Sequence, residues 1–447
     1  MLRTIFVAAL LAGGAGAATA ADSGAVLTGP AAFGDWHKDA PGVVRHITLG
    51  DLPGPNVTPS ASNGPQGGAR PADATPKVPP GFSVQLVASG IKGGPRAIRF
   101  APNGDLFVAD SYTGDVTVFR IHSGKAKPEK VSIFAGGLHQ PYGINFYPPG
   151  PNPKWVYVAD SDKVMRFPYS SGDLKAAGKP EVIVADVPSS DHWTRDVVFS
   201  ADGKTMYLSV GSGSNIAEDM TKAPPGGVAA WAKSHPLGEA WGGEEARAAV
   251  WSFTPEGKDK KVVATGLRNC AGMTLQPATS QLWCVVNERD ELGDNVPFEY
   301  ATHITPGAWY GWPWYYLGNH EDPRHAGERP DLAGQATVPD VLMQAHSAPL
   351  NITFYESDMF PASFRGDAFV AMHGSWNRGT RTGYKVVLLK FKDGKPTGEY
   401  EDFMTGFVLS DSAVWGRPVG VAVAKDGSLF VSEDGSGTIW RVSYTGK

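Results

Sequence analysis

The sequence predicts an all-β protein, a six-bladed β-propeller, because one short pattern recurs six times along its 447 residues. Each copy has an apolar run, a tight turn, and a second apolar run that ends in Asp, Gly or Glu. The turn is Asn103-Gly104 in the first copy and Asp426-Gly427 in the last. Such dipeptides between apolar runs indicate hairpins, and long repeats of hairpins are typical of propellers. The copies cover residues 94–110, 143–160, 194–211, 271–288, 351–374 and 416–433.

Composition agrees with many short strands joined by irregular loops. The chain holds 55 Gly and 36 Pro, which favour turns over long helices. Its formal charge is −5 without a basic run, so no nucleic-acid partner is expected. We predict one propeller domain over residues 79–447. Its final strand, 438–442, could close the ring by pairing with a strand of the first blade.

The N-terminus has the features of an export signal. Arg3 supplies a positive start, residues 5–11 form a short apolar run, and Ala18-Thr19-Ala20 offers a cleavage site. We predict a signal peptide over residues 1–21 and a periplasmic or secreted location. The apolar run is too short to cross a bilayer and no later segment approaches that length, so no membrane span is expected. A small buried N-terminal helix is the alternative.

Residues 22–78 form a Pro/Gly-rich N-terminal extension, expected to wrap the surface or to stay flexible. Two further stretches, 212–248 and 289–347, are too long for simple turns. They are rich in Pro and Trp, and we interpret them as loops that shape a site.

The only cysteines, Cys270 and Cys284, flank one predicted hairpin. Export makes a disulfide between them permissible, and we predict one. Two buried thiols are the alternative.

His192 is the clearest catalytic candidate. It lies just before the predicted strand 197–199, at a strand entrance where propellers collect their sites. A histidine accepts protons near neutral pH, and Asp191 or Asp196 could orient it. A surface histidine beside a turn is the alternative.

Two arginines stand at matching strand entrances of different repeats. Arg268, followed by Asn269, precedes the run 271–275, and Arg417 has the equivalent place in the last repeat. Guanidinium groups there could hold one central anion, although an arginine that ties loops together is as reasonable. A third cation could come from the fifth repeat, where the candidates are Arg378, Arg381 and Lys385.

The segment 287–295 carries many oxygen ligands in one loop. Carboxylate and carbonyl oxygens suit Ca²⁺, although the spacing is not that of an EF-hand. A solvated acidic turn is the alternative. No His/Cys cluster has zinc spacing.

Three motifs together resemble the glucose/sorbosone dehydrogenase family. They are Gly266-Leu267-Arg268-Asn269, the acidic segment 287–294, and the Pro-Gly-Ala-Trp-Tyr-Gly-Trp-Pro segment 306–313. Members of that family are six-bladed propellers that use pyrroloquinoline quinone (PQQ). The resemblance covers residues 79–445. The segments 192–195 and 373–378 look most like the sorbosone-dehydrogenase-like branch.

The resemblance implies roles for particular residues. His192, beside Asp191, matches the base that removes the substrate hydroxyl proton. Arg268, Asn269 and Arg417 match residues that bind the cofactor. Arg289 and Asp290 lie where two backbone carbonyls help to bind calcium.

The sequence departs from the better-known members at three points. Ala271 stands in place of a Gln, and Val419 stands in place of a second Arg. A cofactor-binding Lys is missing from the segment 373–378, where Arg378 is its candidate replacement.

The resemblance therefore implies PQQ-dependent oxidation of an aldose or a sugar aldehyde such as sorbosone, with Ca²⁺, a histidine base, hydride transfer to the quinone, and an external electron acceptor. Two other classes stay open. One is a non-catalytic propeller that binds a carbohydrate or a protein, and the other is a calcium-dependent lactonase.

Overall fold

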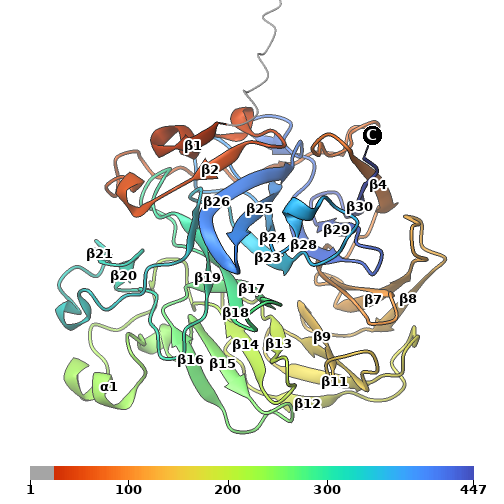
Figure 1. Ribbon diagram of the computed structural model, residues 1–447. Helices are drawn as coiled ribbons and strands as arrows, with labels where there is room; N and C mark the ends of the chain where they lie inside the picture. Colours follow the sequence, from red (N-terminus) through yellow and green to blue (C-terminus); the bar gives the residue numbers. More distant parts are fainter. Residues whose placement is uncertain (1–24, 447) are drawn as a thin grey trace, which may run out of the picture.

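The computed structural model describes residues 25–446, which form six mainly antiparallel sheets arranged around a central axis (Figure 1). The predicted six-bladed propeller is confirmed, and each of the six sequence repeats forms the first two strands of one blade. The first strands of neighbouring blades contact one another, so they line the axis. The predicted signal peptide lies outside the described residues. Within the described part, no helix is long and apolar enough to cross a membrane.

The first three blades follow the chain order. The first blade is β5 (Pro95–Phe100), β6 (Leu106–Asp110), β7 (Asp115–Arg120) and β8 (Lys130–Ala135). The second is β9 (Gly143–Tyr147), β10 (Trp155–Ala159), β11 (Val164–Pro168) and β12 (Glu181–Val184). The third is β13 (Val197–Phe199), β14 (Met206–Val210), β15 (Ala249–Phe253) and β16 (Lys261–Thr265).

The fifth and sixth blades include strands from the N-terminal part of the chain, whereas the fourth blade does not. The fourth blade is β17 (Asn269–Leu275), β18 (Leu282–Asn287), β19 (Glu299–His303) and β22 (Val341–Met343). The fifth is β23 (Pro349–Phe354), β24 (Ala368–Met372), β25 (Lys385–Lys392) and β26 (Lys395–Met404), extended by β2 (Val44–His46) and β1 (Val26–Thr28). The sixth is β28 (Pro418–Val423), β29 (Leu429–Glu433), β30 (Thr438–Tyr444) and β4 (Phe82–Ala88).

The remaining elements are short. Two-stranded pairs are β20 (Tyr315–Tyr316) with β21 (His320–Glu321), and β3 (Gln66–Gly67) with β27 (Ala413–Val414). The α-helix is α1 (Val228–Ser234). The 3-10 helices are η1 (Gly29–Phe33), η2 (Trp36–Lys38), η3 (Leu49–Asp51), η4 (Gly242–Glu244), η5 (Pro330–Leu332) and η6 (Ala362–Phe364).

The ring closes through the final strand. β30 pairs with β4, with Trp440 opposite Leu86 and Val442 opposite Val84. The expected closure of the ring by the final strand is confirmed, but the expected partner strand was wrong. The partner strand precedes the first repeat and forms the outer strand of the last blade, where we had expected a strand of the first blade.

Apolar side chains on both faces of the sheets join the blades. Phe107 of β6 and Phe146 of β9 meet edge to face, with ring centroids 5.0 Å apart, between the first and second blades. Phe100 and Phe430 pack in the same way across the seam between the first and last blades. Strands such as β6 are buried throughout because neighbouring blades cover both faces, which explains their continuous apolar runs.

Three glycines in first strands let the strands come close around the axis. A Cβ at Gly143 would lie 2.6 Å from the carbonyl oxygen of Arg195 in the next blade. A Cβ at Gly272 would lie 2.4 Å from the carbonyl oxygen of Leu350, and a Cβ at Gly420 would lie 2.5 Å from that of Arg96. These approaches leave no room for a side chain, so glycine at alternate blades keeps the inner ring tight.

The predicted disulfide is confirmed. Cys270 and Cys284 are bonded across β17 and β18, with Cα atoms 5.8 Å apart. The bond ties the innermost strand of the fourth blade to its neighbour.

The N-terminal extension wraps the surface, one of its two expected behaviours. β2 pairs with β26 and β1 pairs with β2, so the extension widens the fifth blade (Figure 1, top). The two long insertions pack on each other through an aromatic cluster outside the blades, made of Trp231, Trp241, Trp309, Trp314 and Tyr315.

Candidate functional site

The predicted site residues gather at one end of the propeller, which we call the site end. In every blade the first strand starts and the second strand ends at this end, because the two strands are antiparallel. His192, Arg268 and Arg417 precede first strands, whereas Ser212 and His373 follow second strands. Several first-to-second strand pairs also shift register close to this end. Bulges of this kind re-aim side chains beside functional sites.

His192 has a defined tautomer. Its Nδ1 lies 2.8 Å from Oγ of Ser212, and that hydroxyl donates its own proton to the carbonyl of Ser214 at 2.7 Å. The Ser212 oxygen therefore accepts from Nδ1–H of the imidazole. Asp191 Oδ2, 3.3 Å from Nδ1, favours the same proton position. Nε2 consequently carries the free lone pair, as a general base requires.

His192 is also held in its neutral form. Its side chain is 18% exposed, and burial lowers its pKa well below the usual value of 6.5. The positive charges of Arg268 and Arg247 lower the pKa further. The imidazole is therefore uncharged at neutral pH and able to accept a proton.

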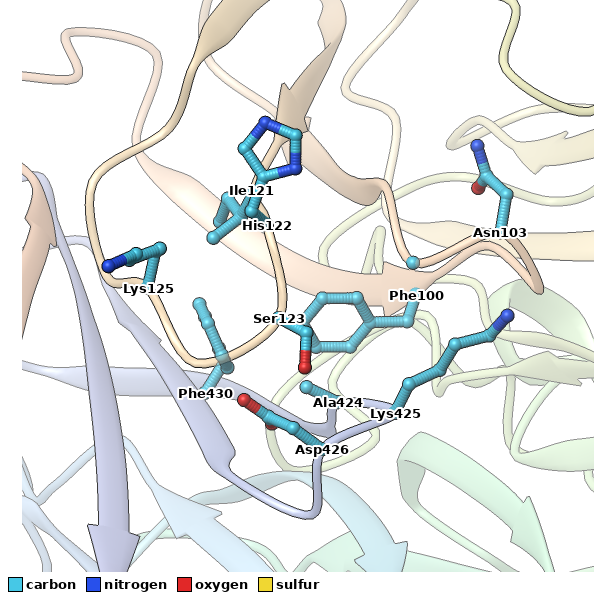
Figure 2. A pocket seen from close by; sticks show the side chains of 11 residues that line it. Phe100, Asn103, Ile121, His122, Ser123, Lys125, Ala424, Lys425, Asp426 and Phe430 are labelled. Atoms are coloured by element: carbon cyan, nitrogen blue, oxygen red, sulfur yellow. The ribbon is translucent and has the colours of Figure 1, made fainter.

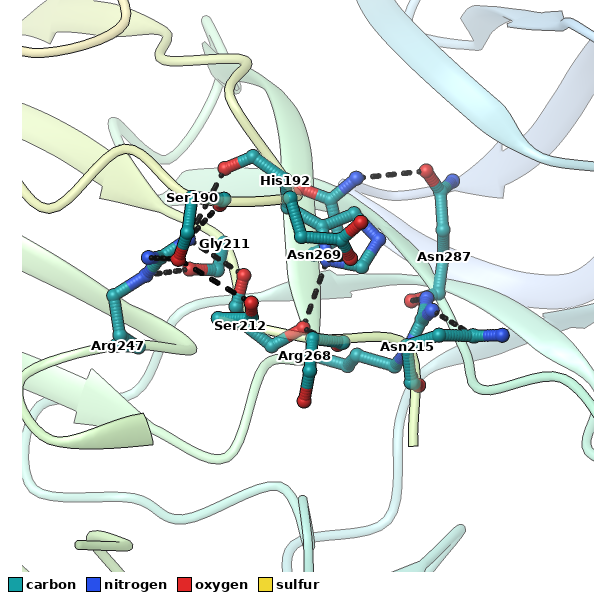
Figure 3. Close-up of polar contacts among 12 residues, drawn as sticks. Ser190, His192, Gly211, Ser212, Asn215, Arg247, Arg268, Asn269 and Asn287 are labelled. Atoms are coloured by element: carbon teal, nitrogen blue, oxygen red, sulfur yellow. Dashed lines mark hydrogen bonds and ion pairs between the residues drawn. The ribbon is translucent and has the colours of Figure 1, made fainter. Parts of the chain in front are cut away.

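Three buried arginines, Arg195, Arg247 and Arg268, lie around His192 without carboxylate partners; Figure 3 shows the latter two. Among the described residues, no carboxylate oxygen lies within 4.0 Å of the guanidinium groups of Arg195, Arg247 or Arg268. Arg247 donates to the carbonyls of Gly211 and Ser212, each at 2.6 Å. Burial and the neighbouring charge of Arg247 lower the pKa of Arg195 to about 9. This part of the site end therefore holds positive charge that an anion could neutralise.

Arg268 binds the start of the loop that follows β18 in the fourth blade, residues 288–295. Its Nη1 donates to the carbonyls of Asn287, at 3.0 Å, and Glu288, at 2.8 Å. Its Nε and Nη2 donate to the backbone and side-chain oxygens of Asn215, at 2.9 and 2.6 Å. The guanidinium plane is therefore fixed by neutral acceptors, which contribute no negative charge of their own.

Asn269 lies against His192. Both residues contact Gly211, where an added Cβ would lie 2.6 Å from Asn269 Oδ1 and 2.7 Å from His192 Cβ. The amide donates to Asn287 Oδ1 at 3.0 Å (Figure 3). Its own Oδ1 is buried and has no hydrogen-bond partner among the described residues. An orphaned buried acceptor of this kind points to a missing ligand.

Arg417 belongs to a second polar group at the same end. Its Nη2 lies 2.9 Å from Nδ1 of His373, whose Nε2 lies 2.8 Å from Asp434 Oδ1. Asp434 also pairs with Arg96 at 2.5 Å, and the Arg96 guanidinium lies 5.1 Å from the ring centre of Trp193. A continuous series of contacts therefore connects Arg417 to Trp193, the residue that follows His192.

The arginine donor requires His373 to accept at Nδ1, so His373 is neutral and donates from Nε2 to Asp434. Burial lowers the pKa of His373 to about 4, and the charge of Arg417 contributes to this shift. Contacts with His373 lower the pKa of Asp434, against the effect of burial.

Arg378 is placed apart from this group. It donates to the carbonyl of Asp294 at 3.1 Å and to that of Phe33 at 2.7 Å, in the N-terminal extension. The other two candidate cations, Arg381 and Lys385, also meet the extension, at Asn63 and Asp39. A cofactor contact for Arg378 stays a prediction. Asp196 bonds to the backbone of Met273, at 2.7 Å, so it links blades while Asp191 faces His192.

Arg289 and Asp290 continue the loop that Arg268 holds. Arg289 pairs with Asp322 at 2.9 Å and donates from Nε to the carbonyl of Asp290 at 2.7 Å. Asp290 Oδ1 lies 3.0 Å from Nδ1 of His346. In residues 25–446 no three His, Cys, Asp or Glu side chains converge as a metal site. Calcium ligation by the two backbone carbonyls stays a prediction.

Sequence reasoning missed Ser212, Asn215, Arg247 and Arg96. A signal for the first was available, because every repeat was seen to end its second apolar run at a polar or small residue. In the third repeat that end is Gly211, directly before Ser212. Arg247 and Asn215 come from the insertion 212–248, which supports its interpretation as a site-shaping loop.

A separate hollow lies between the first and last blades, floored by Phe100 and Phe430 (Figure 2). It is lined by the turns between the first and second strands of both blades and by the turn after β7, so it is at the end of the propeller opposite His192. Asp426 in this hollow accepts from the backbone of Gly124 at 2.8 Å and from Arg441 at 3.0 Å. Its carboxylate therefore fastens the seam between the two blades.

The fold and the site end define a six-bladed propeller with a neutral histidine beside buried arginines that have no carboxylate within 4.0 Å among the described residues. The chain belongs to the TrAA12-like family, which it matches over residues 76–305 and 325–445. A pyrroloquinoline quinone-dependent pyranose dehydrogenase from Coprinopsis cinerea is 24% identical over 418 residues. That alignment covers 81% of this chain and 54% of the relative, so the chain spans about half of that protein's length. An uncharacterised protein from Borreliella burgdorferi is 26% identical over 384 residues, covering 83% of this chain and 91% of that protein.

Solved structures show the same fold. The holo form of the pyranose dehydrogenase PQQ domain from Coprinopsis cinerea has a TM-score of 0.67 at 22% identity, covering 84% of this chain and 98% of that one. A calcium structure of the Trichoderma reesei carbohydrate-active enzyme of family AA12 has a TM-score of 0.66 at 19% identity, covering 83% and 97%. The PQQ-bound aldose sugar dehydrogenase from Streptomyces coelicolor has a TM-score of 0.57 at 17% identity, covering 82% and 99%. The family relationship predicted from the sequence is confirmed.

Proposed function

We propose that this protein is a PQQ-dependent dehydrogenase that oxidises a pyranose or another aldose. One observation carries the proposal: a neutral His192 with a free Nε2 lies beside buried arginines that have no carboxylate within 4.0 Å in the described chain. A tricarboxylate such as PQQ would supply the missing negative charge. The relatives that use PQQ support the choice of this anion.

The residues present fit this cofactor. Arg268 and Arg417 would face its carboxylates, and the orphaned Oδ1 of Asn269 would accept a hydrogen bond from it. Arg195 and Arg247 donate mainly to backbone carbonyls, so they would act chiefly through their charge. When bound, PQQ would accept a hydride from the sugar carbon.

His192 would take the hydroxyl proton of the sugar at Nε2. Ser212 keeps the other ring proton on Nδ1, so the imidazole needs no rearrangement before it acts. The imidazolium that forms would be stabilised by the Asp191 carboxylate, 3.3 Å from Nδ1.

Calcium belongs to the proposal as a second cofactor, held by the backbone carbonyls of Arg289 and Asp290. A carbonyl has two lone pairs, so the Asp290 oxygen could bind the cation while it accepts from Arg289. A calcium structure within family AA12 supports this ion.

A sorbosone-like aldehyde is a second candidate substrate, which we propose on the sequence features of residues 192–195 and 373–378. An external electron acceptor would reoxidise the cofactor. A periplasmic or secreted location fits the N-terminal sequence and the Cys270–Cys284 disulfide, because such bonds persist in oxidising compartments.

The test is reconstitution of the purified protein with PQQ and Ca²⁺. We expect a saturable optical titration at one PQQ per chain, followed by dye reduction with at least one member of a panel of aldoses, sorbosone and simple aldehydes. Omission of PQQ is the control. Failure to bind PQQ, or lactone hydrolysis with Ca²⁺ alone, would overturn the proposal.

A further inference from the structure

The N-terminal extension reaches two loops that start at the candidate site. The family match begins at residue 76, so residues 25–75 lie outside it. They cover the fifth blade, where β1 and β2 extend the sheet (Figure 1). Such a segment could simply protect a sheet edge. Its polar contacts indicate a second role.

The first loop, residues 373–384, follows β24 and starts at His373, which contacts Arg417. Further along this loop, Arg378 donates to the carbonyl of Phe33, and Arg381 donates to Asn63 Oδ1 at 2.9 Å. At its end, Lys385 pairs with Asp39 at 2.7 Å. All three cations of this segment are therefore held by the extension.

The second loop, residues 288–295, follows β18 and starts at the carbonyls that Arg268 holds. The extension contacts this loop through Thr58, whose Oγ1 accepts from the backbone N–H of Asp294 at 2.8 Å. Beside it, the N–H of Asn56 donates to the carbonyl of Leu292 at 2.7 Å.

Asn377 joins both loops to the extension. Its Oδ1 accepts from the backbone N–H of Glu291 at 2.8 Å, and its Nδ2 donates to the carbonyl of Ala61 at 2.6 Å. The side chain is buried, with the residue 3% exposed, so water cannot readily replace either bond. One amide thus fixes three segments that are far apart in the sequence.

We propose that Thr58 and Asn377 are positioning residues, through which the N-terminal extension holds the loop 288–295 in the geometry needed for cofactor and calcium binding. Each accepts a backbone N–H of that loop, which Arg268, His346 and Arg378 of the propeller also contact. Without the extension, the loop would lose its bonds to Thr58 and Asn56, and Asn377 would lose its partner at Ala61. The bonds that Arg268, His346 and Arg378 make to the loop come from the propeller and would remain. The ordering of the loop stands by itself, whereas the effect on affinity depends on the function proposed above.

The test uses the full-length protein and two variants that remove one acceptor each, Thr58→Val and Asn377→Leu. Amide hydrogen exchange of the apo protein is measured at Asp294 and Glu291. The N–H of Asp294 donates to Thr58, and the N–H of Glu291 donates to Asn377. We expect exchange at the corresponding amide to be faster by about fivefold or more, because one net hydrogen bond is lost. Asn377→Asp keeps the acceptor for Glu291, so exchange there should stay close to that of the wild type.

A matched control is Thr279→Val, which removes a hydroxyl bond of 2.6 Å to Gln276 in the turn at the other end of the fourth blade. It should leave exchange in the loop 288–295 unchanged. Thermal midpoints of all variants separate a local effect from general destabilisation.

PQQ titration in the presence of Ca²⁺ is the second readout. Affinity should fall by about threefold to tenfold in Thr58→Val and Asn377→Leu, and not in Thr279→Val. Unchanged exchange at both amides would overturn the positioning role whether or not PQQ binds. Faster exchange with unchanged PQQ affinity would overturn the link to the cofactor. Faster exchange in a protein whose wild type binds no PQQ would support the positioning of the loop and reject the proposed function.

Discussion

The hydroxyl of Ser212 and the imidazole of His192 form a directed pair: Nδ1–H donates to Oγ over 2.8 Å, and Oγ–H continues to the carbonyl of Ser214. The direction follows from the second bond, because a hydroxyl has one proton to donate. Nε2 is thereby kept free, and the residue that sets the tautomer is 20 positions from the histidine it serves.

Replacing Ser212 should therefore lower turnover without abolishing it. In Ser212→Ala the imidazole loses one net hydrogen bond, and Asp191 remains to favour the same tautomer. We expect kcat to fall by about twofold to tenfold with little change in KM. Steady-state kinetics of the reconstituted enzyme measure this. Ser200→Ala, in a turn at the opposite end of the third blade, is the control and should behave as wild type. A large rise in KM at constant kcat would contradict the assigned role.

His192→Gln should remove the base and spare the cofactor. General-base catalysis contributes about 10²- to 10⁴-fold, so turnover should fall by a factor in that range. PQQ affinity, measured by optical titration, should stay near that of the wild type, because the arginines hold the anion. Near-normal turnover at saturating substrate would show that His192 is not the base. Loss of PQQ binding together with activity would show a structural role.

Removing the charge of Arg268 should raise the pKa of His192. Burial and the charge of Arg268 both hold it well below 6.5, so the wild-type imidazole becomes protonated only as the pH falls far below that value. In Arg268→Met one positive neighbour is gone, and protonation should begin at higher pH. An NMR titration of the His192 ring in the apo protein follows this without activity. Arg268→Lys keeps the charge and should leave the titration close to wild type. An unchanged curve in Arg268→Met would reject this electrostatic coupling.

His373 should make the fold less stable in mild acid. Its native pKa is lowered to about 4, from 6.5 in the unfolded chain. Between pH 6.5 and about 4 the unfolded chain binds a proton that the native protein does not, so the free energy of unfolding falls as the pH falls through this window. Asp434, whose pKa is also lowered, loses its contribution only below its usual value of 3.8.

The His373→Gln variant isolates that effect. Glutamine does not titrate, so the loss of unfolding free energy between pH 7 and pH 4.5 should be smaller than in the wild type. Urea denaturation at the two pH values measures the difference. An equal loss in both proteins would mean that His373 is not held neutral in the native state.

The fold could be predicted from the sequence because its signals are local. Turns such as Asn103-Gly104 and Asp426-Gly427 mark hairpins within about 20 residues, and their repetition counts the blades. Cys270 and Cys284 lie on the two strands of one such hairpin, so their pairing could also be predicted from the sequence. Only the structure showed that β4 belongs to the last blade, because ring closure joins the two ends of the chain.

By itself the sequence determined the blades and the strand entrances, and with them His192, Arg268 and Arg417, because antiparallel strands of fixed order bring those positions to one end.

The tertiary structure alone decided which neighbours meet there. Arg378, Arg381 and Lys385 were equivalent candidates in the sequence, yet all three bind the N-terminal extension, more than 300 residues away in the chain. Ser212 and Arg247 reach His192 through the packing of an irregular insertion. Hydrophobic periodicity specifies strands and turns, whereas hydrogen bonds between distant segments depend on how the packed blades orient their loops, and no local pattern records that.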